Sequence, residues 1–170
     1  MKNYYKSVLF IIALISSQFI MAQGTVPAGS GTIGDPYLIA SLDNPEYISL
    51  NTGTWGSAVY MKQTANIDAT ATLGWNSNTG FSPIGISSST PFQGQYDGQG
   101  YTISNLFINR ASSWSQGLFG YGLGATIQNI VLSDVDINGK GGVGGLVGKA
   151  ENATITLCKV SGTVKVQAPA

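Results

Sequence analysis

The stretch GLFGYGLGATI, residues 117–127, recurs 28 residues later as GLVGKAENATI, residues 145–155. The recurrence aligns Gly117 with Gly145 and Gly120 with Gly148, and it ends on the same Ala-Thr-Ile in both copies. A repeat of 20 to 50 residues is typical of solenoid proteins, in which each unit buries its apolar face against its neighbours. This pair of segments therefore predicts a fold built by repetition.

A third segment aligns with the strand-like part of the repeat. YTISNLFIN (101–109) precedes ATIQNIVLS (125–133) by 24 residues, and ATITLCKVS (153–161) follows that segment by 28. Each segment opens with Thr-Ile, so we expect Ile103, Ile127 and Ile155 to stack as one internal column. Asn105 and Asn129 also coincide, whereas Leu157 interrupts that column.

Two solenoids fit this spacing, a leucine-rich repeat and a parallel β-helix. The asparagine of a leucine-rich repeat would fall on Ala111, Val135 and Thr163, and nothing between the units is typical of a helix. A parallel β-helix needs only short strands of β-branched residues and tight corners, which glycine permits. We therefore predict an all-β chain folded as a parallel β-helix.

Composition excludes several classes of function. Of 170 residues only 9% are charged, the formal net charge is zero, and histidine is absent. Without a basic patch we expect no nucleic-acid binding, and without histidine a Ser-His-Asp triad or a histidine zinc site cannot form within the chain. The single cysteine, Cys158, cannot form an internal disulfide, and we expect it to be a small packed residue.

The first 22 residues have the layout of a secretory signal peptide. Lys2 and Lys6 precede an apolar run from Val8 to Ile15, and a polar-to-small segment ends at Ala22. We predict cleavage between Ala22 and Gln23, which makes the protein secreted or exposed at the cell surface. The membrane would be a partner only before cleavage.

Residues 23–56 differ from the repeats, and we interpret them as an N-terminal cap. Asp43, Pro45 and Glu46 resemble a helix start, with Asp43 as the capping residue, and predict one short helix near 44–50. We assign residues 57–170 to the coils, with repeat units at 117–138 and 145–166. We expect the coils to continue in a longer protein, of which this chain is a fragment.

The glycine-rich segments resemble the GLUG-motif family, which is named for Gly-Leu-hydrophobic-Gly. Gly117-Leu118-Phe119-Gly120 and Gly145-Leu146-Val147-Gly148 are two copies, and segments such as GTIGDPYLIAS and FQGQYDGQGYTISNLFINR look like the blocks that precede such motifs. The resemblance implies a right-handed β-helix in exported bacterial surface proteins, which include adhesin-like proteins and peptidase precursors. It brings no catalytic residues and no cofactor.

A nucleotide site is the first alternative for the glycines. GYGLGA (120–125) matches a dinucleotide fingerprint formally, but TIQNIVL follows, which is typical of a strand, whereas the fingerprint requires a helix there. VGKA (147–150) lacks the Ser or Thr that follows the lysine of a phosphate-binding loop. We therefore expect no nucleotide binding, and we expect Lys149 to be a variable outward residue and Gly145 to be structural.

Carboxylate chemistry is the second alternative. Asp134 and Asp136 are two residues apart, which on a regular strand places both carboxylates on one face, about 7 Å apart. That pair suits a polysaccharide-cleaving lyase or glycoside hydrolase, or a divalent ion. Two solvated acids on a strand face are the commoner arrangement, so we expect neither an enzyme nor a metal site.

Aromatic residues in polar segments are the remaining candidates. Trp75 in GWNSN and Trp114 in SSWSQ could stack on sugar rings or anchor a protein interface, or they could plug corners of the coils. We predict a surface module that adheres, acts as a scaffold, or binds an extracellular glycan or surface protein without catalysis.

Overall fold

The fold is almost entirely β-structure in the computed structural model, which describes residues 24–167. Over that range it contains one α-helix, α1 (Asp43–Leu50), and two short 3-10 helices, Thr52–Thr54 and Thr70–Gly74. The all-β prediction is confirmed. The predicted signal peptide and the Ala22–Gln23 cleavage site lie outside the described residues.

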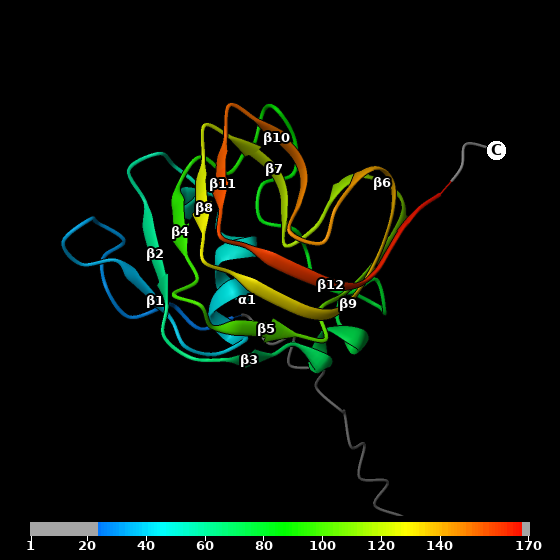
Figure 1. Ribbon diagram of the computed structural model, residues 1–170, viewed down its shortest axis with the longest axis horizontal. Helices are drawn as coiled ribbons and strands as arrows, with labels where there is room; N and C mark the ends of the chain where they lie inside the picture. Colours follow the sequence, from blue (N-terminus) through cyan, green and yellow to red (C-terminus); the bar gives the residue numbers. More distant parts are fainter. Residues whose placement is uncertain (1–23, 168–170) are drawn as a thin grey trace, which may run out of the picture.

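The strands form three parallel sheets (Figure 1). The first sheet has the order β1 (Tyr37–Ile39), β2 (Tyr60–Gln63), β4 (Gln95–Asp97), β8 (Thr126–Gln128), β11 (Thr154–Thr156). The second pairs β7 (Phe119–Leu123) with β10 (Val147–Glu151). The third has the order β3 (Ile67–Asp68), β5 (Thr102–Ser104), β9 (Val131–Val143), β12 (Lys159–Val166), and β6 (Phe107–Gln116) also pairs with β9.

The 28-residue repeat reappears as strand register. Thr126 pairs with Thr154 and Ile127 with Ile155 in the first sheet, while Phe119 pairs with Val147 in the second. The last two repeat units therefore lie directly on one another, as the sequence alignment predicts.

The first unit, however, does not lie where the alignment placed it. Ile103 pairs with Ile67 and Leu132 in the third sheet, and the residue beside Ile127 in the first sheet is Tyr96. The predicted column of Ile103, Ile127 and Ile155 is therefore wrong at its first member. Thr-Ile occurs on two different sheets, and a short pattern of β-branched residues does not distinguish between them.

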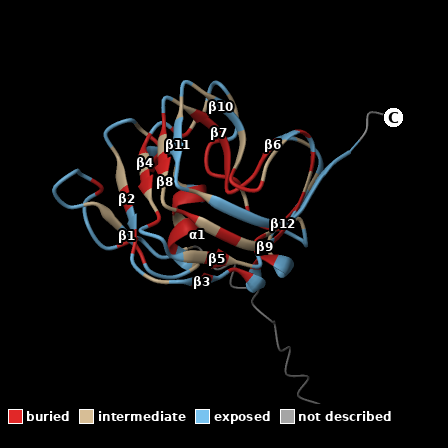
Figure 2. Cartoon of the chain, in the orientation of Figure 1, coloured by how far each residue is buried: buried red, intermediate tan, exposed pale blue. Residues whose placement is uncertain are grey.

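The core consists of buried apolar residues, which alternate with exposed or half-buried residues along several strands (Figure 2). The Phe119 ring lies 4.8 Å from that of Phe92 and 5.5 Å from that of Tyr96, centroid to centroid. These aromatic contacts join the first and second sheets across the interior. β12, in contrast, is exposed along its whole length.

The predicted short helix is present as α1, with Ile48 fully buried in the core. Asp43 is not its cap: Leu42 occupies the N-cap position, and its side chain makes no capping hydrogen bond. Asn44 instead accepts hydrogen bonds from the backbone amides of Ala40 and Ser41, at 2.9 and 3.2 Å. Because Ala40 and Ser41 precede the helix, Asn44 fixes the chain that enters α1, and no side chain caps the helix.

Candidate functional site

Trp114 is the most exposed aromatic residue on the sheets, with 64% of its surface accessible. It lies in β6 opposite Gly141 of β9. A Cβ at position 141 would lie 2.6 Å from a carbon of the indole ring, so only glycine lets the ring lie against this strand. The glycine-rich segment 141–145, which we expected to form corners, therefore also provides the surface on which the exposed Trp114 ring lies.

The backbone at Trp114 is held by its neighbours. Gln116, which is buried, donates its side-chain amide to the carbonyl of Trp114 at 2.6 Å and to that of Ser115 at 3.2 Å. Ser115 has a left-handed φ of 57°. The indole is therefore carried on a fixed corner, which reduces the entropy lost when a ligand binds.

A row of amides lies across β6, β9 and the residue that follows β12. The Asn138 side chain donates to that of Asn109 at 2.9 Å, and the Gln167 side chain donates to that of Asn138 at 3.1 Å. Ile108 and Ile137 beside them are fully buried, so the amides face outward. On β9 Asn138 and Gly141 are three residues apart, so the amides and the Trp114 ring lie on opposite sides of this strand. We call Trp114 together with Gly141 the Trp114 face.

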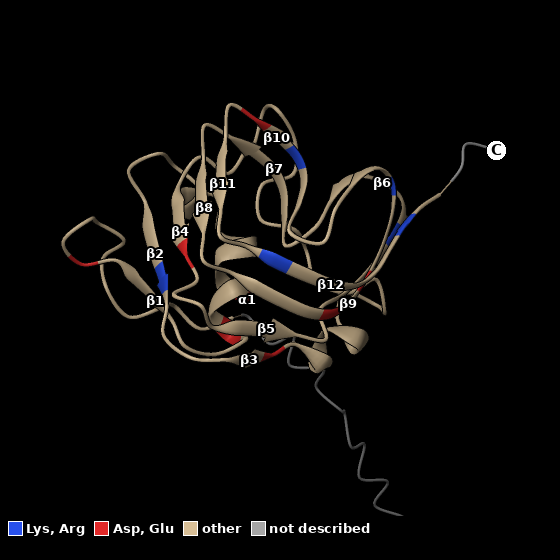
Figure 3. Cartoon of the chain, in the orientation of Figure 1, with Lys and Arg blue, Asp and Glu red and all other residues tan. Residues whose placement is uncertain are grey.

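The charged residues on the strands near Trp114 are mostly basic, and one of them, Lys140, is exposed directly before Gly141 (Figure 3). Arg110 is occupied internally: its guanidinium donates to the carbonyl of Phe81 at 3.2 Å and to the Ser82 hydroxyl at 3.0 Å, and burial lowers its pKa. Lys165 approaches Asp136 at 3.9 Å in an exposed pair. The Trp114 face therefore offers an aromatic ring with one exposed cation, Lys140, next to it along β9.

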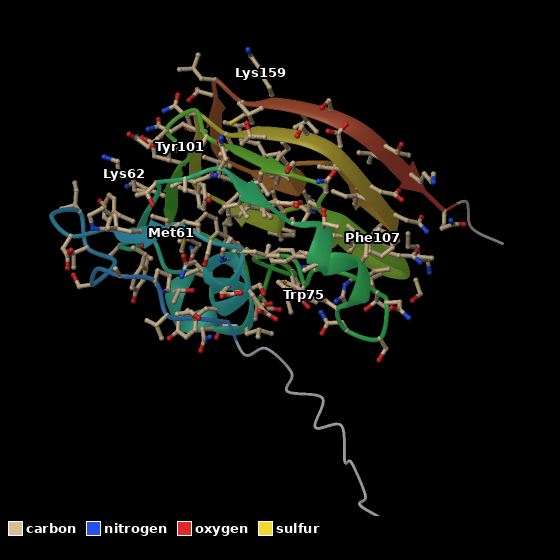
Figure 4. All side chains as sticks on the ribbon, turned by 90° about the horizontal axis from the view of Figure 1, so that it is seen from below. Met61, Lys62, Trp75, Tyr101, Phe107 and Lys159 are labelled. Atoms are coloured by element: carbon tan, nitrogen blue, oxygen red, sulfur yellow. The ribbon has the colours of Figure 1, made fainter. Side chains whose placement is uncertain are left out.

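Trp75, the second predicted aromatic, has a different setting. It is half-buried against the core, with its ring 6.3 Å from that of Phe81, and Figure 4 shows it below the labelled Phe107. The half-buried Trp75 fits the interpretation in which the ring fills a corner of the coils. The exposed Trp114 fits the interpretation in which the ring is accessible to a ligand.

Asp134 and Asp136 are both exposed, but the strand between them is irregular. Asp134 has a φ of 54° and lies at a bulge, where the register against β12 shifts between Val160 and Gly162. The bulge departs from the regular strand on which the 7 Å spacing was based, although Asp134 and Asp136 both lie exposed on either side of the buried Val135. On β12, Gly162 pairs with Val135 and Thr163 with Asp136.

The glycine-rich segments form strands. GYGLGA ends β7 and leads into β8, so a strand follows it, as predicted. Lys149 lies in β10, where its ammonium is 2.9 Å from the Glu151 carboxylate and 5.2 Å from the centre of the Tyr121 ring. No helix begins at either segment, so neither presents the free amides of a helix N-terminus to a phosphate.

Other chemistry is limited. The half-buried Cys158 thiol lies 3.2 Å from the carbonyl oxygen of Thr156. Between residues 24 and 167, no group of three or more His, Cys, Asp or Glu side chains could hold a metal ion. No helix in this part of the chain is long and apolar enough to cross a membrane.

One corner of the sheets is a feature that the sequence did not reveal. An open groove of about 630 Å³ is lined by residues of three successive repeats, among them Gly100, Asn129 and Leu157. Beside it the Asp97 carboxylate accepts hydrogen bonds from Asn129 and Gln128 at 2.9 and 3.0 Å. Partial burial raises the pKa of Asp97, but these bonds and the Gln99 amide outweigh it and hold the pKa below its usual range.

Comparison with known proteins identifies the repeat. Residues 139–165 match the model of the GLUG motif, so the resemblance to the GLUG-motif family is confirmed at the second copy. Halomucin from Haloquadratum walsbyi is 38% identical over 153 residues, and a candidate Gly-rich membrane protein from Evansella cellulosilytica is 34% identical over 150. The alignments include 86% and 83% of this chain but only 2% and 16% of those relatives.

The fold also resembles a solved structure. The 1.30 Å crystal structure of a candidate immunoglobulin A1 protease from Bacteroides ovatus superposes with a TM-score of 0.61 over 79% of this chain and 40% of that one. Sequence identity is 20%, so the likeness concerns the fold alone.

Proposed function

We propose that this chain, which carries the GLUG motif, is a secreted or cell-surface module that binds an extracellular glycan or surface protein without a chemical step. Its framework is a right-handed parallel β-helix. The three parallel sheets and the 28-residue register between the last two repeat units support this architecture. Export rests on the predicted signal peptide, and the naming of one relative as a membrane protein is consistent with it.

The observation that carries the binding proposal is the exposed indole of Trp114, which lies on Gly141. An aromatic face stacks on the C–H face of a sugar ring. Because Lys140, directly before Gly141, is an exposed cation, charge does not select between a neutral and a uronate-rich glycan, and both belong in the test.

The test is a panel of neutral and uronate-rich polysaccharides incubated with the chain from Gln23 onward. We expect binding without release of new chain ends, and at least a tenfold loss of affinity for Trp114→Ala, in line with the effect of removing an aromatic anchor. Trp75→Ala is the matched control because Trp75 is partly covered by the core. Equal affinity for wild type and Trp114→Ala would refute the assignment of the face.

The same panel tests the alternative, a polysaccharide-cleaving enzyme that uses Asp134 and Asp136. Turnover that disappears in Asp136→Asn would establish that enzyme and overturn the non-catalytic proposal. The bulge at Asp134 and the open surroundings of both carboxylates favour the binding role.

A further inference from the structure

The turn between β10 and β11, at the rim of the molecule, carries an exposed asparagine (Figure 1). Asn152 opens the tripeptide Asn152-Ala153-Thr154, and no other asparagine in the sequence is followed two residues later by Ser or Thr. Asn-x-Ser/Thr, with any residue except proline at x, is the acceptor sequence for N-linked glycans in exported proteins. Its use depends on whether the folded chain presents the asparagine amide and the hydroxyl to solvent.

Two other asparagines at corners of the coils have a structural role that Asn152 lacks. Asn105 and Asn129 hold left-handed φ angles of 60° and 56°, and Asn152 holds one of 51°. The amides of Asn105 and Asn129 donate to the carboxylates of Asp68 and Asp97, at 3.0 and 2.9 Å. The Asn152 side chain is exposed and makes no hydrogen bond within residues 24–167. The backbone conformation favours asparagine at all three corners, but only Asn152 among them has a free amide.

The exposure of this corner does not depend on a strand that lies beyond it. Glu151 pairs with Leu123 and Thr154 with Thr126, so Gly124 occupies the corresponding corner one layer earlier. Gly124 is exposed although β10 and β11 stack on its layer. It holds a left-handed φ of 64°, and a Cβ built on it would meet nothing within 4 Å. A side chain at this corner therefore points into solvent and has room for a sugar at its end.

The hydroxyl of the acceptor sequence is accessible as well. Thr154 is the first residue of β11 and is exposed. Its partner Thr126 lies in β8, which has a strand on each side, and is still only half-buried. A threonine in this column therefore keeps its side chain at the surface when both neighbouring strands are present. Both groups that a glycan transferase recognises are accessible in the folded chain.

We infer that Asn152 is an attachment site for an N-linked glycan, with a lipid-phosphate-linked oligosaccharide as the donor. The Nδ2 atom of Asn152 forms a bond to the anomeric carbon of the first sugar, the bond from that carbon to the lipid phosphate breaks, and Nδ2 loses one proton. The inference rests on export, as the proposed function does, but not on the Trp114 face, which lies on β6 and β9. The attached glycan adds uncharged polar surface to a chain with only 9% charged residues.

The test uses the chain recovered from the surface or the medium of the cells that produce it. Trypsin cleaves after Lys149 and Lys159, so mass spectrometry detects Asn152 in the peptide 150–159. We expect this peptide to carry the added mass of an oligosaccharide that fragmentation assigns to Asn152. Asn152→Gln and Thr154→Val should both lack the glycan, whereas Thr154→Ser should retain it because serine keeps the hydroxyl.

Thr154→Val is the matched variant, because valine retains Asn152 and suits a strand. Its circular dichroism should equal that of the wild type, and a glycan on this variant would overturn the inference. An unmodified peptide 150–159 from an exported wild-type chain would also overturn it and leave the proposed function intact. A chain that stays inside the cell with residues 1–22 attached and no glycan would overturn both. Trp114→Ala should leave the attached glycan unchanged, since that residue lies on β6.

Discussion

Gly120 is the position where one methyl group is expected to damage the fold most clearly. It is buried in β7, between the backbone at Gly85 and the backbone at Ser115. A Cβ there would overlap the carbonyl oxygen of Gly85, and it would lie 2.5 Å from that of Ser115, where ordinary contact begins near 3.4 Å. One of these backbones must move by about 1 Å, and a backbone cannot rotate away as a flexible side chain can.

The expected loss in the free energy of unfolding follows from the packing and the two hydrogen bonds that this movement disturbs. Overpacking costs about 1–3 kcal/mol. The hydrogen bonds from the Gly120 amide to Ile84 and from the Tyr121 amide to Gly85, both 2.9 Å, contribute about 1 kcal/mol each. We expect Gly120→Ala to lower the free energy of unfolding by about 3–5 kcal/mol, a large part of the stability of a domain of this size.

Gly122 provides the control within the same strand. A Cβ there would meet only the Ala125 Cβ at 3.8 Å and a Val147 methyl at 4.0 Å. Urea denaturation followed by circular dichroism should place Gly122→Ala within about 0.5 kcal/mol of wild type. Equal midpoints for the two variants would refute the argument that β7 is confined by backbone on both sides.

Three further variants test other parts of the account. Leu157→Asn should raise stability by about 0.5–1 kcal/mol, because Leu157 holds a φ of 53° while 82% exposed and asparagine tolerates that conformation better; a loss measured by urea denaturation would contradict this. Lys149→Ala should leave the thermal midpoint unchanged, since its pair with Glu151 is exposed, and a clear drop would assign it a structural role. Asp97→Asn should lower stability at neutral pH. Because the pKa of Asp97 is lowered in the folded protein, its contribution to the free energy of unfolding is present above about pH 4 and is lost as pH falls through the folded pKa. The free energy of unfolding of the variant should therefore fall less steeply with decreasing pH in that range. The same pH dependence in the variant and the wild type would contradict this.

The repeat could be found from the sequence because its signal is local and doubled. Gly-Leu-x-Gly and Ala-Thr-Ile recur at one offset, and strands stacked in parallel convert an offset directly into register. The first unit was misplaced because Thr-Ile alone carries no information about which sheet it joins. Its position is set by the chain between residues 69 and 95, which contains few regular elements.

The sequence also did not reveal which glycines are tightly surrounded by backbone. The sequence singled out Gly145, but an added Cβ there would meet mainly the Val160 side chain, which lies at the open edge and can move. Gly120 and Gly148 are instead confined by backbone. Which glycine is confined depends on how distant segments approach, and no local pattern records this.

The site was predicted only in part. Trp114 was a candidate because its neighbours are polar, but the role of Gly141 in seating the ring depends on pairing between β6 and β9. Asp134 and Asp136 satisfied a spacing rule that assumes a regular strand, and a one-residue bulge removes that premise. Bulges of this kind come from the register of both strands, so one strand's sequence does not reveal them.

The fold depends on successive repeats that lie in parallel at an offset of 28 residues. An engineered disulfide between paired strands tests this register most directly. In a Cys158→Ser background, Thr126→Cys with Thr154→Cys places the two thiols on directly paired residues of β8 and β11. We predict rapid oxidation to a monomeric disulfide in the folded protein, with no bond for the shifted pair Thr126→Cys and Thr156→Cys. Equal oxidation of both pairs, or of the shifted pair alone, would contradict the register and the stacking that depends on it.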